Sequence, residues 1–246
     1  MQRLMLTLRY DGTAYHGWQV QPNAPTVQQT LQDAVEWVTG VRSGLTGCSR
    51  TDAGVHAAMF CCTLDTESPL RDNKLCSALN FYLPEDISVY RADEVAAEFH
   101  PRYDARGKRY VYRIWNGAQR NPFYSRYSLH RNRPLDEALL NRAAADFVGS
   151  HDFAAFCSAD SDTQGTTVRT VRLCRVERQG ELIRISVEAD GFLYNMVRIM
   201  VGTLLDMADG RIPPDGIPAI LAGKDRTRAG TTAPARGLCL EEVFYK

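Results

Sequence analysis

The 246-residue chain has few of the features that mark metal, disulfide or nucleotide-binding proteins. Its seven cysteines form no Cys-x-x-Cys pair and its five histidines are scattered, so neither a zinc site nor a disulfide framework is indicated. This cysteine usage favours a reducing cytoplasm. Neither Gly-x-Gly-x-x-Gly nor a phosphate-binding Gly-Lys-Ser/Thr motif occurs. We therefore expect a protein that uses no metal, redox cofactor or bound nucleotide.

A long apolar run and a net charge are also missing. The apolar stretch 191–205 is too short to span a membrane and contains Arg198, and residues 1–10 are too short and too charged for a signal peptide. Lys and Arg together number 29, as do Asp and Glu, which argues mildly against a strongly basic nucleic-acid protein. With 44% hydrophobic residues, the chain is expected to be soluble and to form one large domain or two compact ones.

The charge is unevenly distributed along the chain. Residues 91–133 hold ten basic side chains against four acidic ones, together with eight aromatic residues. Basic groups bind phosphates and aromatic rings stack on unpaired bases, so this composition suits a face that reads RNA. A solvated face over an aromatic core would have the same composition, and both interpretations stay open.

The hydrophobic pattern predicts an α+β fold with a mostly antiparallel sheet. Helices are predicted over 27–39, with a capping box at Thr26 and a stop at Gly40, and over 71–81, 135–147, 192–208 and 216–222. Strands are predicted over 4–10, 59–64, 87–95, 108–116, 171–178 and 182–190, with a last strand that ends at 244. Pro101 and residues 104–107 suit a joint between two halves, which we place at 1–103 and 104–246.

The segment 47–57 has the composition of a functional loop. Asp52 is its only acid and Arg50 its only strong base, and Gly44, Gly47 and Gly54 allow sharp turns and a close approach to a ligand. A catalyst that uses one carboxylate as a nucleophile needs such an isolated acid. The alternative is an ordinary turn with a surface pair of Arg50 and Asp52.

Arg198 is the only charged residue of an otherwise apolar helix, which should be buried. A buried guanidinium without a partner costs several kcal/mol, roughly, so an acceptor is expected opposite it. Asp52, Asp190, Asp206 and a backbone carbonyl are the candidates. An aspartate usually titrates near ~3.9, and a cation within ~4–6 Å keeps a buried carboxylate ionised.

Tyr110 and Tyr112 alternate with Val111, so they share one face of a strand. Either ring suits stacking on a flat base, and core packing is the alternative for both. For Arg50, the pattern allows a phosphate contact, a place in the RNA stack, or a surface ion pair.

Five collinear blocks of the sequence resemble the TruA family of tRNA pseudouridine synthases. The active-site run of that family is similar to Ser-Arg-Thr-Asp-Ala-Gly-Val-His-Ala at 49–57. The other blocks are Tyr-Asp-Gly-Thr at 10–13 with Gly-Trp-Gln at 17–19, Lys-Arg-Tyr-Val-Tyr-Arg at 108–113, Met-Val-Arg at 196–198 with Gly202, and Lys-Asp-Arg at 224–226 through Ala-Pro at 233–234 to Gly-Leu at 237–238. They run from about residue 10 to 245, so the resemblance covers the whole chain.

This resemblance implies two ferredoxin-like halves that share one sheet, the first with the Asp52 loop and the second with Tyr110 and Arg198. It implies conversion of uridine to pseudouridine at tRNA positions 38, 39 and 40 in the anticodon stem-loop, without a cofactor. Asp52 aligns with the nucleophile, Arg198 with its basic partner, and Tyr110 with the tyrosine that stacks on the substrate base. Arg50 aligns with the residue that fills the gap left by the flipped base. The family works as a homodimer on tRNA.

Two other classes of protein fit part of the pattern. A catalytically silent RNA-binding module explains the basic and aromatic stretch but gives no reason for Arg198 or the Asp52 loop. A hydrolase with an aspartate nucleophile explains the loop, although a paired-acid mechanism needs a second carboxylate that the loop lacks.

Overall fold

A computed structural model describes residues 1–158 and 165–245 of the chain. Contacts between residues divide it into two compact units: a first unit of residues 1–106 and 239–246, and a second unit of residues 107–238. The division expected from the sequence placed everything after residue 103 in the second half. The structure differs at the C-terminal end, because strand β10 (Leu238–Phe244) pairs with β3 (His56–Thr66), a strand of the first unit.

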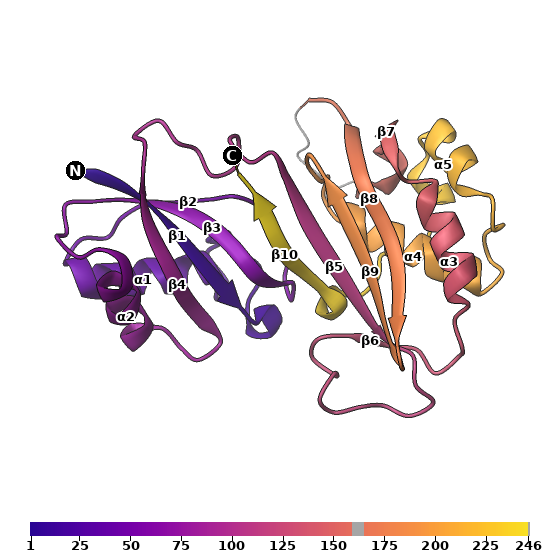
Figure 1. Cartoon of the computed structure of the whole chain (residues 1–246), viewed down its shortest axis with the longest axis horizontal. Coiled ribbons are helices and arrows are strands. Elements are labelled where there is room, and N and C mark those ends of the chain that lie inside the picture. The colour runs from indigo at the N-terminus through magenta and orange to yellow at the C-terminus, as the bar shows by residue number, and fades with distance from the viewer. Residues whose placement is uncertain (159–164, 246) are drawn as a thin grey trace. The chain divides into compact units, whose positions relative to one another are not determined.

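The first unit alternates strands and helices in the order β-α-β-β-α-β (Figure 1). Its elements are β1 (Gln2–Tyr10), the short 3₁₀ helix η1 (Gly12–Ala14), α1 (Val27–Thr39), β2 (Leu45–Gly47), β3, α2 (Asp72–Tyr82) and β4 (Ile87–Val95). The strands lie in the order β4-β1-β3, with β2 and β10 also paired to β3, and every pair is antiparallel except β3–β10. The order β4-β1-β3-β2 is that of a ferredoxin-like unit, as the resemblance implies.

Helix α1 shows how local sequence sets the bounds of an element. The side chain of Thr26 accepts a hydrogen bond from the backbone N–H of Gln29, which satisfies one of the free donors at the helix start. Gly40 ends the helix in the left-handed conformation, with φ of 75°. Val27, Leu31 and Val35 share its buried face. These three features confirm the predicted helix.

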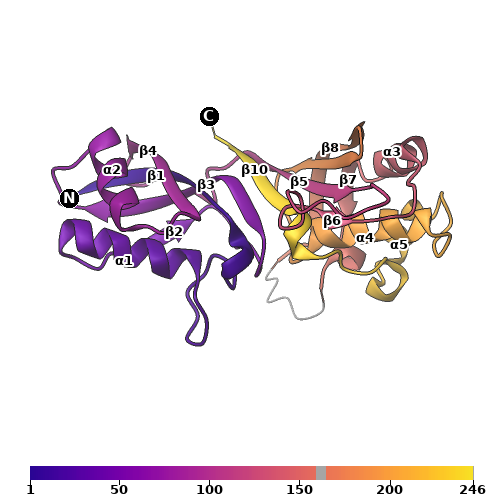
Figure 2. The ribbon, with the colours of Figure 1, turned by 90° about the horizontal axis from the view of Figure 1, so that it is seen from below.

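The second unit repeats the mixture of elements (Figure 2). It contains β5 (Gly107–Trp115), β6 (Leu129–His130), α3 (Glu137–Ala145), β7 (Gly149–Asp152), η2 (Ala154–Phe156), β8 (Val168–Gln179), β9 (Leu182–Ala189), α4 (Met196–Ala208), α5 (Ile217–Gly223), η3 (Arg226–Arg228) and η4 (Ala235–Gly237). The strand order is β5-β9-β8-β7, all antiparallel, and β6 joins β5 in parallel. Along β9, buried and half-buried residues alternate, which is the pattern of a strand with one face on the core.

Helix α4 is buried nearly all round, as its apolar sequence predicts. Its start was predicted wrongly at residue 192. The helix begins at Met196, because Asn195 takes the left-handed conformation with φ of 60° and residues 192–195 are not helical. In the described part of the chain, no helix has the length and apolar character needed to cross a membrane. Over residues 1–158 and 165–245, ten strands and five α-helices confirm the α+β class with mostly antiparallel pairing.

Candidate functional site

The Asp52 loop, residues 48–55, connects β2 to β3 and is held from both sides by backbone hydrogen bonds. The carbonyl of Thr51 accepts from the N–H of Trp18 at 3.1 Å, and the N–H of Gly54 donates to the carbonyl of Tyr15 at 3.1 Å. The hydroxyl of Thr51 lies 2.8 Å from that of Tyr10. Thr51, directly before the acid, and Gly54, two residues after it, are therefore fixed by groups on the N-terminal segment.

Two glycines of that segment allow this close approach. A Cβ atom on Gly12 would lie 2.0 Å from the carbonyl oxygen of Val55, and one on Gly17 would lie 2.3 Å from the carbonyl oxygen of Thr51. Gly17 also has φ of 87°, a conformation that residues with a side chain rarely adopt. Of the three glycines that the sequence pointed to, Gly47 is tightly packed, with a Cβ 2.6 Å from Trp18 Nε1, and Gly54 has φ of 77°, whereas a Cβ on Gly44 would meet open space. Gly12 and Gly17 lie more than thirty residues before the Asp52 loop in the chain.

His56 serves this packing rather than chemistry. The side chain is 5% exposed, and its Nδ1 accepts a hydrogen bond from the N–H of Gly12 at 3.0 Å. Asp11 Oδ1 lies 3.1 Å from the same nitrogen, but an Nδ1 that accepts from Gly12 carries no proton to donate. The hydrogen bond from Gly12 ties the start of β3 to the N-terminal segment.

The two side chains of the loop that are predicted to be functional are more exposed than Thr51 and Val55. Asp52 is half-buried and Arg50 is exposed, whereas Thr51 and Val55 are 7% and 2% exposed. The buried residues anchor the loop, and the acid and the base lie outward from it. This is an acid on a rigid support, as a nucleophile requires.

A pocket of about 240 Å³ lies beside the loop within the first unit. Its lining residues are Trp18, Gln19, Gln28, Leu45, Thr46, Gly47, Ser49, Arg50, His100, Arg102 and Tyr103. Among these described residues, two are arginines and none is an acid. The pocket thus has the charge needed to bind an anion.

Arg198 lies in the first turn of α4, in the second unit. Its Nε donates to the carbonyl of Ala233 at 2.7 Å and a terminal N–H donates to Asn195 Oδ1 at 2.7 Å. These two acceptors are a backbone carbonyl and a side-chain amide oxygen, and both hold the guanidinium in place. A backbone carbonyl was one of the acceptors that the sequence left open, and Ala233 supplies it.

The other acids considered for Arg198 have partners of their own. Asp206 is 5% exposed, forms an ion pair with Arg211 and accepts from the N–H of Thr231 at 2.9 Å. Asp190 accepts from the N–H of Thr170 at 3.1 Å. The pairing of Asp52 with Arg198 stays a prediction.

The two tyrosines of β5 differ in their surroundings. Tyr112 is fully buried, and its hydroxyl donates to the carbonyl of Pro234 at 2.8 Å. Burial raises the pKa of Tyr112. A Cβ on Gly237 would lie 2.5 Å from the same ring. Tyr110 is 6% exposed and meets the edge of Phe192 with ring centres 5.1 Å apart. Tyr112 is thus committed to packing, which leaves Tyr110 as the candidate for a base contact.

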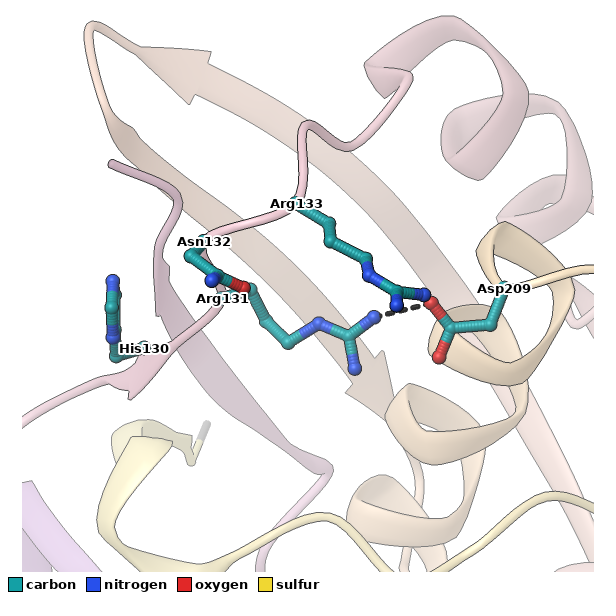
Figure 3. Close-up of a pocket in the computed structure, with 5 residues that line it drawn as sticks. All are labelled: His130, Arg131, Asn132, Arg133 and Asp209. Carbon is teal, nitrogen blue, oxygen red and sulfur yellow. Dashed lines mark hydrogen bonds and ion pairs between the residues drawn. The ribbon is translucent and has the colours of Figure 1, made fainter. Parts of the chain in front are cut away.

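A second pocket, of about 360 Å³, lies within the second unit (Figure 3). Arg131 and Arg133 follow β6, and Asp209 follows α4. Arg131 donates to Asp209 at 2.5 Å, and Arg133 extends toward the same carboxylate in Figure 3. Arg211 also pairs with Asp209, at 2.8 Å. Because Asp209 offsets one of the two arginines that line it, this pocket is less suited to bind an anion than the pocket beside the Asp52 loop.

Comparison with known proteins identifies the class. The model of a family described as tRNA pseudouridine synthase matches residues 7–104 and 143–246, which is most of the chain. The chain therefore belongs to the tRNA pseudouridine synthase family, and the protein is an isomerase of that class.

Full-length relatives give the same assignment. Proteins named tRNA pseudouridine synthase A from Moorella thermoacetica, Thermoanaerobacter sp. and Acetivibrio thermocellus are 47%, 45% and 44% identical to the chain. In each case the similarity covers 100% of both proteins. The family resemblance seen in the sequence is confirmed.

Proposed function

We propose that this tRNA pseudouridine synthase acts on uridines 38, 39 and 40 of the anticodon stem-loop. The N1–C1′ bond of the uridine breaks, the base turns, and a C5–C1′ bond forms. The hydrogen of C5 leaves as a proton to water and N1 gains a proton. All atoms of the product come from the substrate and water, so the reaction proceeds without a cofactor.

Asp52 is the proposed nucleophile, acting on C1′ of the ribose or on the uracil ring, or removing a proton from the sugar. Arg198 is proposed to keep the carboxylate ionised and aimed through an ion pair. The support from the structure is that the Asp52 loop is locked by buried backbone contacts while Asp52 stays half-buried at its surface. This observation carries the proposal, because an incidental turn has no need of such anchoring.

The target base must leave its stack before the carboxylate reaches it. Base flipping costs a few kcal/mol, roughly, which stacking and backbone contacts offset. Tyr110 is proposed to stack on the flipped uracil, since Tyr112 is occupied by packing and by its bond to Pro234. Arg50, exposed beside the acid, is proposed to fill the gap left in the RNA stack.

Release of tritium from tRNA labelled at uracil C5 tests the activity and the nucleophile together. The wild-type protein should release tritium to water, because joining C1′ to C5 expels that hydrogen. Asp52→Asn, which removes the charge with little change in volume, should abolish release while tRNA binding survives. Transcripts with uridine at only one of positions 38, 39 and 40 locate the reaction.

The same assay separates the alternatives. Binding of tRNA without tritium release by the wild type would favour a silent RNA-binding module. Hydrolysis of small phosphate esters that a chelator stops would favour a metal-dependent hydrolase. More than a trace of activity in Asp52→Asn would show that the nucleophile is another group.

We also propose that the enzyme works in the cytoplasm as a homodimer with one tRNA lying across both subunits. This part rests on the family alone. Light scattering of the purified protein should give twice the mass of one chain. A monomer that stays active at every concentration would contradict it.

A further inference from the structure

We propose that the pocket beside the Asp52 loop binds a nucleotide of the RNA that neighbours the target uridine, with Arg102 on its phosphate and Tyr103 against its base. The inference rests on the proposed function and adds a subsite to it. All residues of the pocket belong to the first unit.

The charges of the pocket suit a phosphate. Arg50 and Arg102 are both exposed, and within the part of the chain that the structure describes neither forms an ion pair with a carboxylate. Two uncompensated guanidinium groups on one small concave surface raise the local positive potential, although the chain as a whole is neutral. The guanidinium fork fits the oxygens of a phosphodiester.

A tight turn fixes the pocket wall that carries Arg102. Nδ1 of His100 accepts from the N–H groups of Arg102 and Tyr103 at 3.1 and 3.3 Å, and Asp104 accepts from the N–H of His100 at 2.8 Å. Since Nδ1 is the acceptor, the proton of the neutral ring is on Nε2. His100 also lines the pocket.

Tyr103 supplies an aromatic surface at the pocket. Its ring packs on His100 with centres 4.2 Å apart, and 76% of the residue is exposed. An exposed Tyr103 ring adds nothing to the hydrophobic core. A base stacked on the ring would remove its apolar surface from water. Base–aromatic stacking tolerates any base. The subsite therefore suits recognition of RNA without regard to the neighbouring sequence.

Binding of an anticodon stem-loop hairpin to Asp52→Asn protein, measured over a range of salt concentrations, tests the subsite. Adding Arg102→Gln should weaken binding roughly ten-fold and lower the salt slope by about 0.7–0.9, the change expected when one phosphate contact is lost. Arg142→Gln, an exposed arginine on α3 outside the pocket, should change neither quantity. An unchanged affinity and slope in Arg102→Gln would overturn the phosphate site.

The stacking role has its own pair of variants. Tyr103→Ala should weaken hairpin binding by about ten-fold, whereas Tyr103→Phe should bind like the parent, because stacking needs the ring and not the hydroxyl. In the otherwise wild-type enzyme the losses should fall on KM more than on kcat. Equal binding by the two Tyr103 variants would exclude stacking. Tritium release by the wild type shows separately whether the proposed function holds, so failure of the subsite and failure of the function are distinguishable.

Discussion

The two units support their proposed functional residues in different ways. In the first unit, Asp52 lies on a loop with little regular structure, held because Gly12 and Gly17 let backbone meet backbone. In the second unit, Arg198 lies on a helix that is buried almost completely and Tyr110 on strand β5, between β6 and β9. The position of Asp52 thus depends on a few close backbone contacts. The positions of Arg198 and Tyr110 depend on the hydrophobic core of the second unit.

This difference predicts which single substitutions should damage each unit. One added methyl group at a glycine can displace the Asp52 loop while most of the hydrophobic core of the first unit stays intact. In the second unit, many residues of α4 are buried. The loss of one polar contact there should therefore remove only a small share of the free energy of unfolding. The following predictions test this contrast, from the largest expected effect to the smallest.

Replacing Arg198 should have the largest effect. Arg198→Gln removes the charge proposed to hold Asp52 ionised, which should cost about 3 kcal/mol in the transition state, or roughly 100-fold in turnover. Arg198→Lys keeps the charge but loses the fork that binds Ala233, and should keep more activity than Arg198→Gln. Tritium release measures turnover, and thermal unfolding shows that both variants fold. Equal activity of Arg198→Gln and wild type would contradict the role of the charge.

Gly17→Ala should damage the Asp52 loop selectively. The new Cβ would lie 2.3 Å from the carbonyl of Thr51, so the loop must move, and turnover should fall by about ten-fold or more. Gly40→Ala is the matched control, because its φ of 75° is also left-handed but a Cβ there meets open space. It should cost about 1 kcal/mol of stability and leave turnover unchanged. Similar turnover in both variants would mean that the close approach is dispensable.

The tyrosines of β5 should separate into a structural and a functional residue. Tyr112→Phe loses the hydrogen bond to Pro234 and should lower the free energy of unfolding by about 1 kcal/mol, with activity retained. Tyr110→Phe should change little, since it keeps the ring. Denaturant titration and tritium release measure the two properties. Loss of activity in Tyr112→Phe without loss of stability would reverse the assignment of the two residues.

The smallest effect is expected at a partly exposed ion pair of the first unit. Both guanidinium contacts of Arg3 to Asp65 measure 2.8 Å, and their hydrogen bonds lower the pKa of Asp65. A lowered pKa in the folded state stabilises the protein above the usual carboxyl pKa of about 4, and the contribution is lost as the pH falls through the lowered value. Arg3→Gln should therefore lower the free energy of unfolding slightly at pH 7, and by less at a pH below the lowered pKa of Asp65, where only the bond from Arg3 to the carbonyl of Phe99 is still lost. Denaturant titration at both pH values measures the difference. An equal loss at the lower pH would indicate lost packing instead of lost charge.

Elements with strong local signals could be predicted from the sequence. Thr26 and Gly40 mark the ends of α1 through their own hydrogen bonds and backbone conformation, so no distant contact is needed to place them. The start of α4 was missed because Asn195 takes a left-handed conformation, which its residue type allows but does not require. The strands β2, β6 and β7 have two to four residues each and are too short to show a period.

The candidate site was predictable only in its residue types. The isolated Asp52 and the single charge of Arg198 stand out in the sequence, and the family resemblance gives each a role. The contacts of Gly12 and Gly17 with the loop are tertiary, and nothing near either glycine in the sequence indicates its partner. The same holds for the pocket beside the loop, which joins residues 18–28, 45–50 and 100–103.

The second unit is inserted into the first, and this has a consequence for how the protein is made. Ribosomes add residues from the N-terminus onward, so β10 follows the whole second unit out of the exit tunnel. Its Cys239 and Leu240 pair with His56 and Ala57, directly after the Asp52 loop. Until then, the strand that follows the loop lacks this neighbour. A nascent chain interrupted before residue 239 therefore exposes the edge of β3 at the residues that directly follow the Asp52 loop.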